Sequence, residues 1–307
     1  MKNPLFMSTV ALGIMASINS YIFAGTGAIK NTLEGEDRIY QWRYGNIFYK
    51  VRGEGEKILL LHNIHQGASS FEWINNFSVL SEHFRVYAPD LPGFGRSEKV
   101  KRGYRAKLYV KLIFDFIDSV IKDECSVIAS GLSSIYAIRN GTLYPRKIKS
   151  LFLIDPPALE RGKKSEIIEL LTYQILSSPV LGRSIYNLMT SKLFIRNFLK
   201  TEVYSKTVTG DMVNYYHMAG HQQGSELFYP SFICGLLNMN VSEEFKHLNQ
   251  EITVLFGKET DYYDRMNILK KLNPAVKFKI FKNCKILPHE ENAGDFNKFI
   301  EESSTVS

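Results

Sequence analysis

Short apolar runs rich in β-branched residues alternate along this chain with longer amphipathic stretches, and no other feature restricts its fold as strongly. The longer stretches repeat their apolar residues with the period of a helix, at 105–121, 132–143, 265–272 and 293–302. The short runs have the length and composition of strands, at 46–52, 57–61, 85–88, 125–129, 150–154, 252–256 and 276–281. Strands that alternate with helices predict an α/β fold, with a mostly parallel sheet flanked by helices on both faces.

The alternation is interrupted once, between residues 158 and 250. This segment contains no convincing strand pattern but several helical ones, such as 165–176 and 212–219. We therefore expect a helical cap inserted before the penultimate strand, with the α/β core formed by residues 38–157 and 251–307. Aromatic residues are plentiful in the cap, and they either close an apolar pocket over the sheet or simply pack the interior of the cap.

The amino terminus is a mostly apolar segment over residues 1–25, followed by a polar, glycine-rich stretch at 26–37 that we interpret as a linker. The apolar run is long enough to cross a hydrocarbon core of roughly 30 Å and exceeds the length of a typical signal-peptide core. We therefore expect an uncleaved membrane anchor and a membrane-associated protein. The alternatives are a signal peptide cleaved after Ala24, which would lead to secretion, and a buried helix.

Composition excludes several classes of protein. The 307 residues are 45% hydrophobic and 22% charged, which is ordinary for a folded chain and unlike a disordered, collagen-like or polytopic membrane protein. The net charge of +7 is scattered, so we expect no nucleic-acid partner, although an anionic membrane surface would suit it. The three cysteines, Cys125, Cys234 and Cys284, are too few and too far apart for a disulfide framework or a Cys-x-x-Cys metal site.

Four landmarks carry a resemblance to a known family. Residues 58–62 are an apolar run ending in His62, with Gly67 and Phe71-Glu72-Trp73 after it. Residues 86–97 read Val-Tyr-Ala-Pro-Asp-Leu-Pro-Gly-Phe-Gly-Arg-Ser. The other two are a strand–turn–helix pattern over 127–145 that leads into Leu151–Asp155, and Leu287-Pro288-His289-Glu290-Glu291 before the last helix. Over roughly residues 38–302 the chain resembles the α/β-hydrolase fold family, in its cap-bearing esterase and dehalogenase-like branch.

The resemblance implies a Ser-His-acid triad, and two of its three positions hold residues that cannot perform the chemistry. The Gly-x-Ser-x-Gly turn falls on Ala129-Ser130-Gly131-Leu132-Ser133, so the nucleophile position is Gly131. Glycine has no side-chain oxygen and cannot form a covalent intermediate. The general-base position falls on Ile286, whose side chain cannot take up a proton.

The acid position falls on Asp261, with Glu259 as an alternative one step away. An acid there normally orients the histidine, and that role disappears when Ile286 replaces the base. Asp155, after the run 150–154, is the other place where this fold can carry its acid, and a turn role before Pro156 is an equal alternative.

The oxyanion loop also departs from the family. Many relatives have His-Gly after the strand, whereas this chain has His62-Asn63-Ile64-His65. The hole could persist with the amides of Leu132 and of a residue near Ile64 as donors. We expect a structural role for His62 and a position in the pocket wall for His65.

Other side chains offer weaker alternatives. Ser133 and His289 could serve as displaced nucleophile and base, although a capping role for Ser133 and a packing role for His289 are the simpler interpretations. Ser130 should point away from the pocket. His217 and His221 have the spacing of metal ligands but lack a third ligand in a zinc pattern, so we expect no metal, and no motif calls for a cofactor.

Three hypotheses follow. The leading one is a non-catalytic relative that binds a small apolar or acyl-type ligand, or a partner, near a membrane. The second is an ester hydrolase that works through Ser133 and His289. The third is a structural or interaction protein without a ligand pocket.

Overall fold

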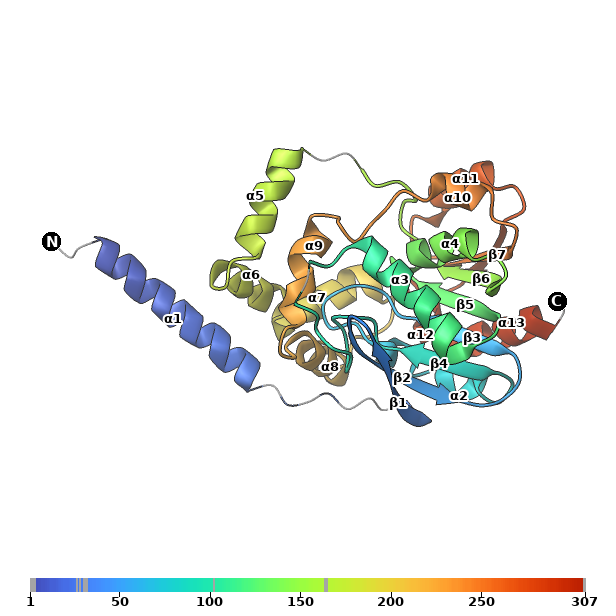
Figure 1. Ribbon diagram of the computed structural model, residues 1–307, viewed down its shortest axis with the longest axis horizontal. Coiled ribbons are helices and arrows are strands. Elements are labelled where there is room, and N and C mark those ends of the chain that lie inside the picture. The colour runs from blue at the N-terminus through green and yellow to red at the C-terminus, as the bar shows by residue number, and fades with distance from the viewer. Residues whose placement is uncertain are drawn as a thin grey trace.

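The computed structural model describes residues 4–25, 27, 29, 33–101, 103–162 and 165–305 (Figure 1). These residues form a sheet of eight strands in the order β1-β2-β4-β3-β5-β6-β7-β8. The strands are β1 (Glu36–Trp42), β2 (Gly45–Arg52), β3 (Lys57–Leu61), β4 (Arg85–Pro89), β5 (Cys125–Ser130), β6 (Ile148–Ile154), β7 (Glu251–Gly257) and β8 (Lys277–Phe281). The pairs β1–β2 and β2–β4 are antiparallel, and all the other neighbours are parallel. The predicted mostly parallel sheet is confirmed.

Helices cover both faces of the sheet because successive side chains of each strand point to opposite sides. Leu59 and Leu61 of β3 are buried in one cluster with residues of α3 (Ala106–Phe116) and α4 (Ser133–Leu143). Ile58 and Leu60, one residue out of phase, are buried in a second cluster with residues of α2 (Phe77–Leu80) and α13 (Ala293–Thr305). The first layer also holds α10 (Ser242–Lys246) and α11 (Tyr262–Leu272), and α12 (Pro288–Glu291) directly precedes α13.

Between β6 and β7 the chain leaves the sheet and forms the helical cap. Its helices are α5 (Glu166–Leu176), α6 (Leu181–Met189), α7 (Lys192–Phe198), α8 (Gly210–Gly220) and α9 (Tyr229–Ile233). The insertion before the penultimate strand therefore lies where the interrupted alternation predicted it. In Figure 1 these helices lie to one side of the sheet, beside the carboxyl ends of the parallel strands.

The expected linker is wrong at its carboxyl end, because β1 begins at Glu36 inside it. β1 is an edge strand whose residues are exposed apart from the half-buried Tyr40 and the buried Trp42. A strand with so few buried side chains carries no clear alternation of apolar and polar residues, so the pattern that identified the other strands was missing. Residues 26, 28 and 30–32 of the expected linker lie outside the described residues.

The amino-terminal apolar segment forms the helix α1 (Pro4–Ala24). No helix in the described part of the chain is both long and apolar enough to cross a membrane. The first three residues of that segment lie outside the described residues. The carboxyl-terminal half of α1 packs on α6 of the cap, where Asn19 is buried.

Candidate functional site

A cavity of about 440 Å³ lies between the cap and the carboxyl ends of the parallel strands. Loops after β3, β5, β6 and β8 form its floor, and the cap forms its roof. From the core, the lining residues include Asn63, Ile64, His65, Gly131, Leu132, Asp155, Arg265, Ile286 and Leu287; from the cap they include Phe198, Leu199, Val203, Tyr216 and Phe232. The volume suits a small organic ligand, and most of the wall is apolar.

The turn after β5 keeps the backbone of a nucleophile elbow. β5 ends at Ser130, Gly131 has a φ of +53°, and α4 begins at Ser133. The Gly131 amide donates to the Ile154 carbonyl oxygen at 2.8 Å, which ties the turn to the end of β6. A side chain at position 131 would therefore project toward the cavity, as it does in a hydrolase elbow.

The space in front of Gly131 is filled by Asn63. A Cβ atom added at Gly131 would lie 2.1 Å from Asn63 Oδ1 and 2.4 Å from Asn63 Nδ2, well inside contact distance. The left-handed φ at Gly131 would strain any side chain as well. A side chain from the loop after β3 thus occupies the space that a side chain at position 131 would need.

The same carboxamide occupies the expected oxyanion hole. Asn63 Oδ1 accepts hydrogen bonds from the amides of Ile64 at 2.7 Å and Leu132 at 3.0 Å. These are the two donors that the sequence suggested, and the structure brings them together on one oxygen. That oxygen belongs to the protein itself, so a substrate oxygen could reach the two amides only after Asn63 had rotated away.

The remaining triad positions do not form a proton relay. Ile286 is half-buried and lines the cavity, so an apolar surface faces the elbow where a base would lie. Asp261 and Glu259 are exposed and lie outside the cavity wall, and Glu259 accepts a hydrogen bond from Ser205 Oγ at 2.7 Å. Neither carboxylate therefore has a histidine to orient.

Asp155 is the acidic residue that reaches the cavity. It follows β6 with a φ of +44°, and Arg265 Nη2 donates to its Oδ1 at 2.6 Å. Burial raises the pKa of Asp155 above its ordinary value, although the neighbouring Arg265 guanidinium opposes that shift. The pair places a compensated charge in one wall of a cavity whose surface is mostly apolar.

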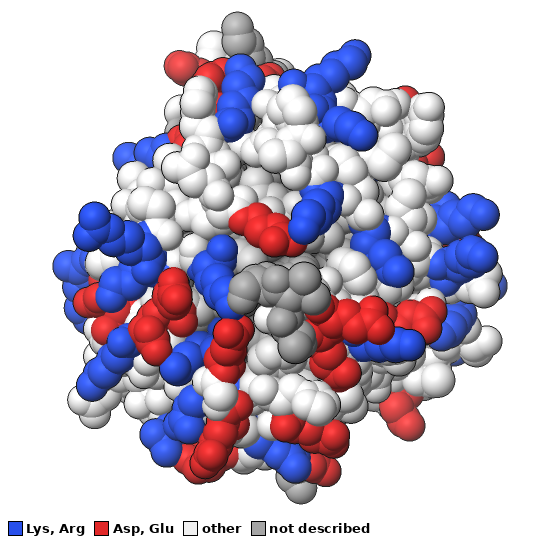
Figure 2. Space-filling view, turned by 90° about the vertical axis from the view of Figure 1, so that its right-hand side faces the viewer, with Lys and Arg blue, Asp and Glu red and all other residues white. Residues whose placement is uncertain are grey.

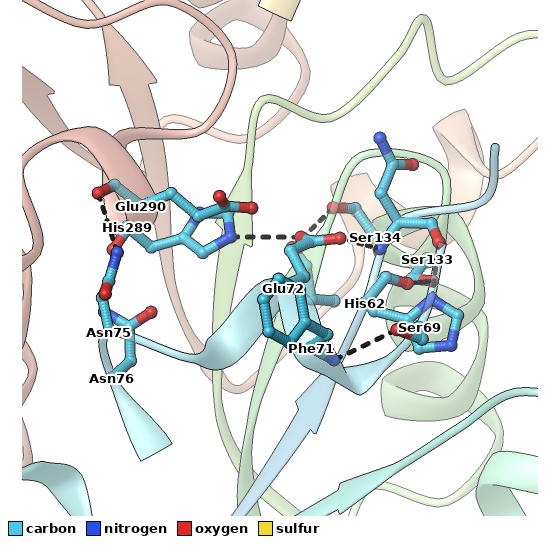
Figure 3. A network of polar contacts seen from close by, with 12 residues as sticks. His62, Ser69, Phe71, Glu72, Asn75, Asn76, Ser133, Ser134, His289 and Glu290 are labelled. Carbon is cyan, nitrogen blue, oxygen red and sulfur yellow. Dashed lines mark hydrogen bonds and ion pairs between the residues drawn. The ribbon is translucent and has the colours of Figure 1, made fainter. Parts of the chain in front are cut away.

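The displaced pair that could have replaced the triad is not assembled. Ser133 is buried, and its Oγ donates to the His62 carbonyl oxygen at 2.6 Å. His289 is also buried, and its Nε2 lies 3.1 Å from Glu72 Oε1. Figure 3 shows His289 and Ser133 on opposite sides of Glu72, and neither residue lines the cavity.

Glu72 is the site residue that the sequence analysis did not single out. Its Oε2 accepts a hydrogen bond from the Asn63 amide at 2.8 Å, and its Oε1 faces His289. Burial alone would raise the pKa of the Glu72 carboxyl, but hydrogen bonds from His289 and Ser130 hold it below its ordinary value. The carboxylate fixes the backbone of Asn63 and so directs its side chain toward Gly131. The only available signal was an acidic residue in the apolar setting of Phe71-Glu72-Trp73.

His62 and His65 occupy different environments. His62 is buried, accepts from the Leu91 amide through Nε2 at 2.9 Å and donates to the Asn63 carbonyl oxygen through Nδ1 at 2.6 Å. Burial lowers the pKa of both His62 and His65. His62 therefore joins the loops after β3 and β4 as a neutral side chain, whereas His65 lines the cavity beside Tyr216, with ring centroids 5.5 Å apart.

The two cap histidines engage the backbone. Nδ1 of His217 lies 2.8 Å from the Thr190 carbonyl oxygen, and Nδ1 of His221 lies 2.8 Å from the His217 carbonyl oxygen. Within the described ranges, no group of three or more His, Cys, Asp or Glu side chains is arranged to hold a metal ion.

Comparison with known proteins identifies the family. The family model described as "Alpha/beta hydrolase family" matches residues 58–297. A 2-hydroxy-6-oxo-6-(2'-aminophenyl)hexa-2,4-dienoic acid hydrolase from Metapseudomonas resinovorans is 26% identical over 113 residues, 36% of this chain and 39% of that protein. A soluble epoxide hydrolase from Corynebacterium sp. (strain C12) is 32% identical over 111 residues, 35% of this chain and 37% of that protein. The chain thus spans less than half the length of either of these two curated relatives.

A solved structure extends the likeness to most of the chain. The serine hydrolase involved in carbazole degradation (CarC enzyme) superposes with a TM-score of 0.74 at 15% identity, covering 89% of this chain and 100% of that one. At such an identity the likeness concerns the fold, and the family match supplies the membership. The chain belongs to the α/β-hydrolase family.

Proposed function

We propose that this chain is a non-hydrolysing member of its family, whose cavity binds a small apolar or acyl-type ligand. The observation that carries the proposal is the Asn63 carboxamide, which lies where a nucleophile side chain would project and accepts both oxyanion-hole amides. Triad members act as a unit. The absence of a hydroxyl at position 131, or of an imidazole at position 286, would therefore be sufficient by itself to remove the usual mechanism.

The wall of the cavity supports the ligand class. Its apolar surface comes from Leu132, Ile286, Leu287 and several cap residues, and its one ion pair, between Asp155 and Arg265, is internally compensated. A ligand without net charge can enter such a site without leaving a buried charge unpaired. The presence of the cavity argues against the purely structural alternative.

Hydrolysis through Ser133 and His289 is the competing proposal, favoured by the activities named for the relatives. It is opposed by the contacts of the two side chains, since Ser133 Oγ donates to the His62 carbonyl oxygen and His289 faces Glu72. The test is an assay of the full chain with p-nitrophenyl butyrate, comparing Ser133→Ala with Ser134→Ala. Ser134 is a matched control because it is equally buried and also donates to a backbone carbonyl oxygen.

We expect no turnover above the spontaneous rate in any of the three proteins. Turnover that disappears in Ser133→Ala and persists in Ser134→Ala would overturn the proposal. Ligand binding is tested separately, by titrating the protein with the uncharged apolar dye Nile red and following its fluorescence. Ile286→Trp fills part of the cavity and should weaken binding by about tenfold or more, whereas Ile286→Val should bind nearly as well as the unaltered chain. Equal binding by both variants would contradict binding in this cavity.

A further inference from the structure

The helix α5 exposes nearly all of its large apolar side chains. None of its eleven residues is buried, and Ile167, Ile168, Leu170 and Leu171 are 53% to 71% exposed. Leu188 of α6 and Leu193 of α7 extend this surface and are 66% and 81% exposed. A helix of this composition normally buries its apolar stripe against another element. We call these six side chains the cap apolar face.

The helix α1 adds an uncharged segment beside this face. Its 21 residues include no charged side chain, and Ile14 and Ile18 are more than half exposed. Asn19 fixes α1 to the cap, because its Nδ2 donates to the Val180 carbonyl oxygen at 3.1 Å and its Oδ1 accepts from Asn187 Nδ2 at 2.8 Å. Figure 1 shows α1 and α5 on the same side of the molecule, both projecting away from the sheet, with α6 near the point where they approach each other.

The distribution of charge favours a lipid surface over a protein partner. α7 carries the exposed cations Lys192 and Arg196 next to Leu193 and contains no acidic residue. Of the two acidic residues of α5, Glu169 is paired with Arg161, and Glu166 is exposed in the first turn of the helix. The opposite side of the molecule is different, since Figure 2 shows Lys and Arg interspersed with Asp and Glu over that face. The six side chains are all Ile or Leu, whereas protein interfaces are enriched in Tyr, Trp and Arg.

A second cavity lies next to the ligand site. It has a volume of about 260 Å³ and shares Phe198, Tyr216 and Phe232 with the first cavity. Phe194 and Phe198 of α7 line it, and both are exposed on the surface of the cap. The helix that carries Leu193 therefore also contributes apolar walls to a cavity beside the ligand site.

We propose that the cap apolar face docks on the surface of an anionic lipid bilayer, with α1 and α5 lying at the boundary between headgroups and acyl chains. A surface that combines exposed aliphatic residues with nearby cations, here Lys192 and Arg196 of α7, binds in this manner, through buried apolar area and attraction to anionic lipids. The docking goes beyond ligand binding and does not depend on it.

The test is co-sedimentation of the full chain with vesicles made of equal parts phosphatidylcholine and phosphatidylglycerol. The variant Leu171→Glu/Leu193→Glu places two charges on the cap apolar face. The matched control Ile39→Glu/Ile268→Glu changes two similarly exposed apolar residues on β1 and α11, and circular dichroism checks that both variants are folded. We expect the unaltered chain and the control to bind, and the cap variant to partition at least about tenfold more weakly.

Three results would overturn the proposal. The first is an unaltered chain that stays in the supernatant with these vesicles. The second is equal binding by the cap variant and the control. The third is evidence that the cap apolar face binds a second copy of the chain instead. In that case sedimentation velocity without vesicles would show a dimer that only the cap variant dissociates, and the chain would not bind vesicles. Weaker binding to phosphatidylcholine alone, and weaker binding at high salt, would support the role of the cations.

Discussion

At the scale of single residues, Asn63 explains how an elbow can survive without its nucleophile. The amides of Ile64 and Leu132 point at one place, and buried amides need an acceptor. Asn63 Oδ1 supplies it, in the volume that a side chain at Gly131 would otherwise claim. The backbone arrangement of a catalytic turn is thereby stabilised by a group that has no part in hydrolysis.

A double-mutant cycle measures this relation. Gly131→Ala should lower the free energy of unfolding by about 2 kcal/mol, because of strain at positive φ and the contact with Asn63. In the background of Asn63→Gly the contact is absent, so the same change should cost about 1 kcal/mol less. Urea unfolding of the four proteins provides the comparison. Additive effects would mean that the two side chains do not compete for one space.

The raised pKa of the Glu290 carboxyl predicts that the stability of the folded protein depends on pH. Its Oε2 accepts from the Tyr204 hydroxyl at 2.6 Å, and burial together with the negative charge of Glu72 raises the pKa of Glu290 to about 8. An unfolded glutamate has a lower pKa, of about 4.3, so the folded protein binds this proton more tightly. The proton on Glu290 therefore contributes to the free energy of unfolding. This contribution is fully present below the unfolded pKa and is lost as pH rises toward about 8.

Glu290→Gln keeps an acceptor for Tyr204 and cannot titrate, so its unfolding temperature should fall less between pH 5 and pH 8 than that of the unaltered chain. Glu82→Gln changes an exposed carboxyl and serves as the control. Parallel pH profiles for the chain and Glu290→Gln would refute a raised pKa at this site.

The residues of the site were only partly predictable. The strand–turn–helix pattern over 127–145 and the run 287–291 led to Gly131 and Ile286 as the expected nucleophile and base positions, and both residues line the same cavity. The contact between Asn63 and Gly131 joins residues far apart in sequence and depends on one side-chain rotamer, which no local pattern encodes. Glu72 was missed for the same reason, since its role comes from contacts with Asn63 and His289 that exist only in the folded chain.

At the scale of elements, the pattern of the sequence was most informative where burial is greatest. The strands from β2 to β8 lie within two residues of their predicted bounds. β2 to β7 each bury several apolar side chains, and β8, of which only Phe281 is buried, still alternates polar and apolar residues. β1 was missed because it begins with the charged residues Glu36, Asp37 and Arg38 and contains no apolar run or alternation. α1 was predicted as an apolar segment, but its attachment to the cap rests on Asn19, a buried polar residue within an apolar run, and on Phe23, whose ring contacts Tyr186 and His221.

Asn19→Ala should therefore loosen α1. The change leaves Asn187 Nδ2 without its acceptor and removes the bond to the Val180 carbonyl oxygen, a loss of about 1–3 kcal/mol in local stability. Hydrogen exchange followed by mass spectrometry should show α1 exchanging about tenfold faster or more. Ser20→Ala, which removes an exposed hydroxyl bonded within α1 itself, should leave the exchange unchanged. Equal effects of the two substitutions would mean that Asn19 does not hold the helix.

At the scale of the whole molecule, the fold is retained with little sequence in common. The family match covers 58–297, and the TM-score of 0.74 to a serine hydrolase accompanies only 15% identity. The core clusters on the two faces of the sheet maintain the architecture, and the cap closes a cavity at the carboxyl ends of the strands. Since fold does not determine activity, the function depends on the few residues around that cavity.

Covalent labelling with a fluorophosphonate tests the central claim most directly, because the reagent forms an adduct with an activated serine. Intact-mass spectrometry of the full chain should show no adduct under conditions in which a conventional serine hydrolase is fully labelled. Asn63→Gly/Gly131→Ser/Ile286→His, which removes the obstructing carboxamide and returns an alcohol and an imidazole, asks whether the scaffold can still activate position 131. A stoichiometric adduct on Ser130, Ser133 or any other serine of the unaltered chain would contradict the account.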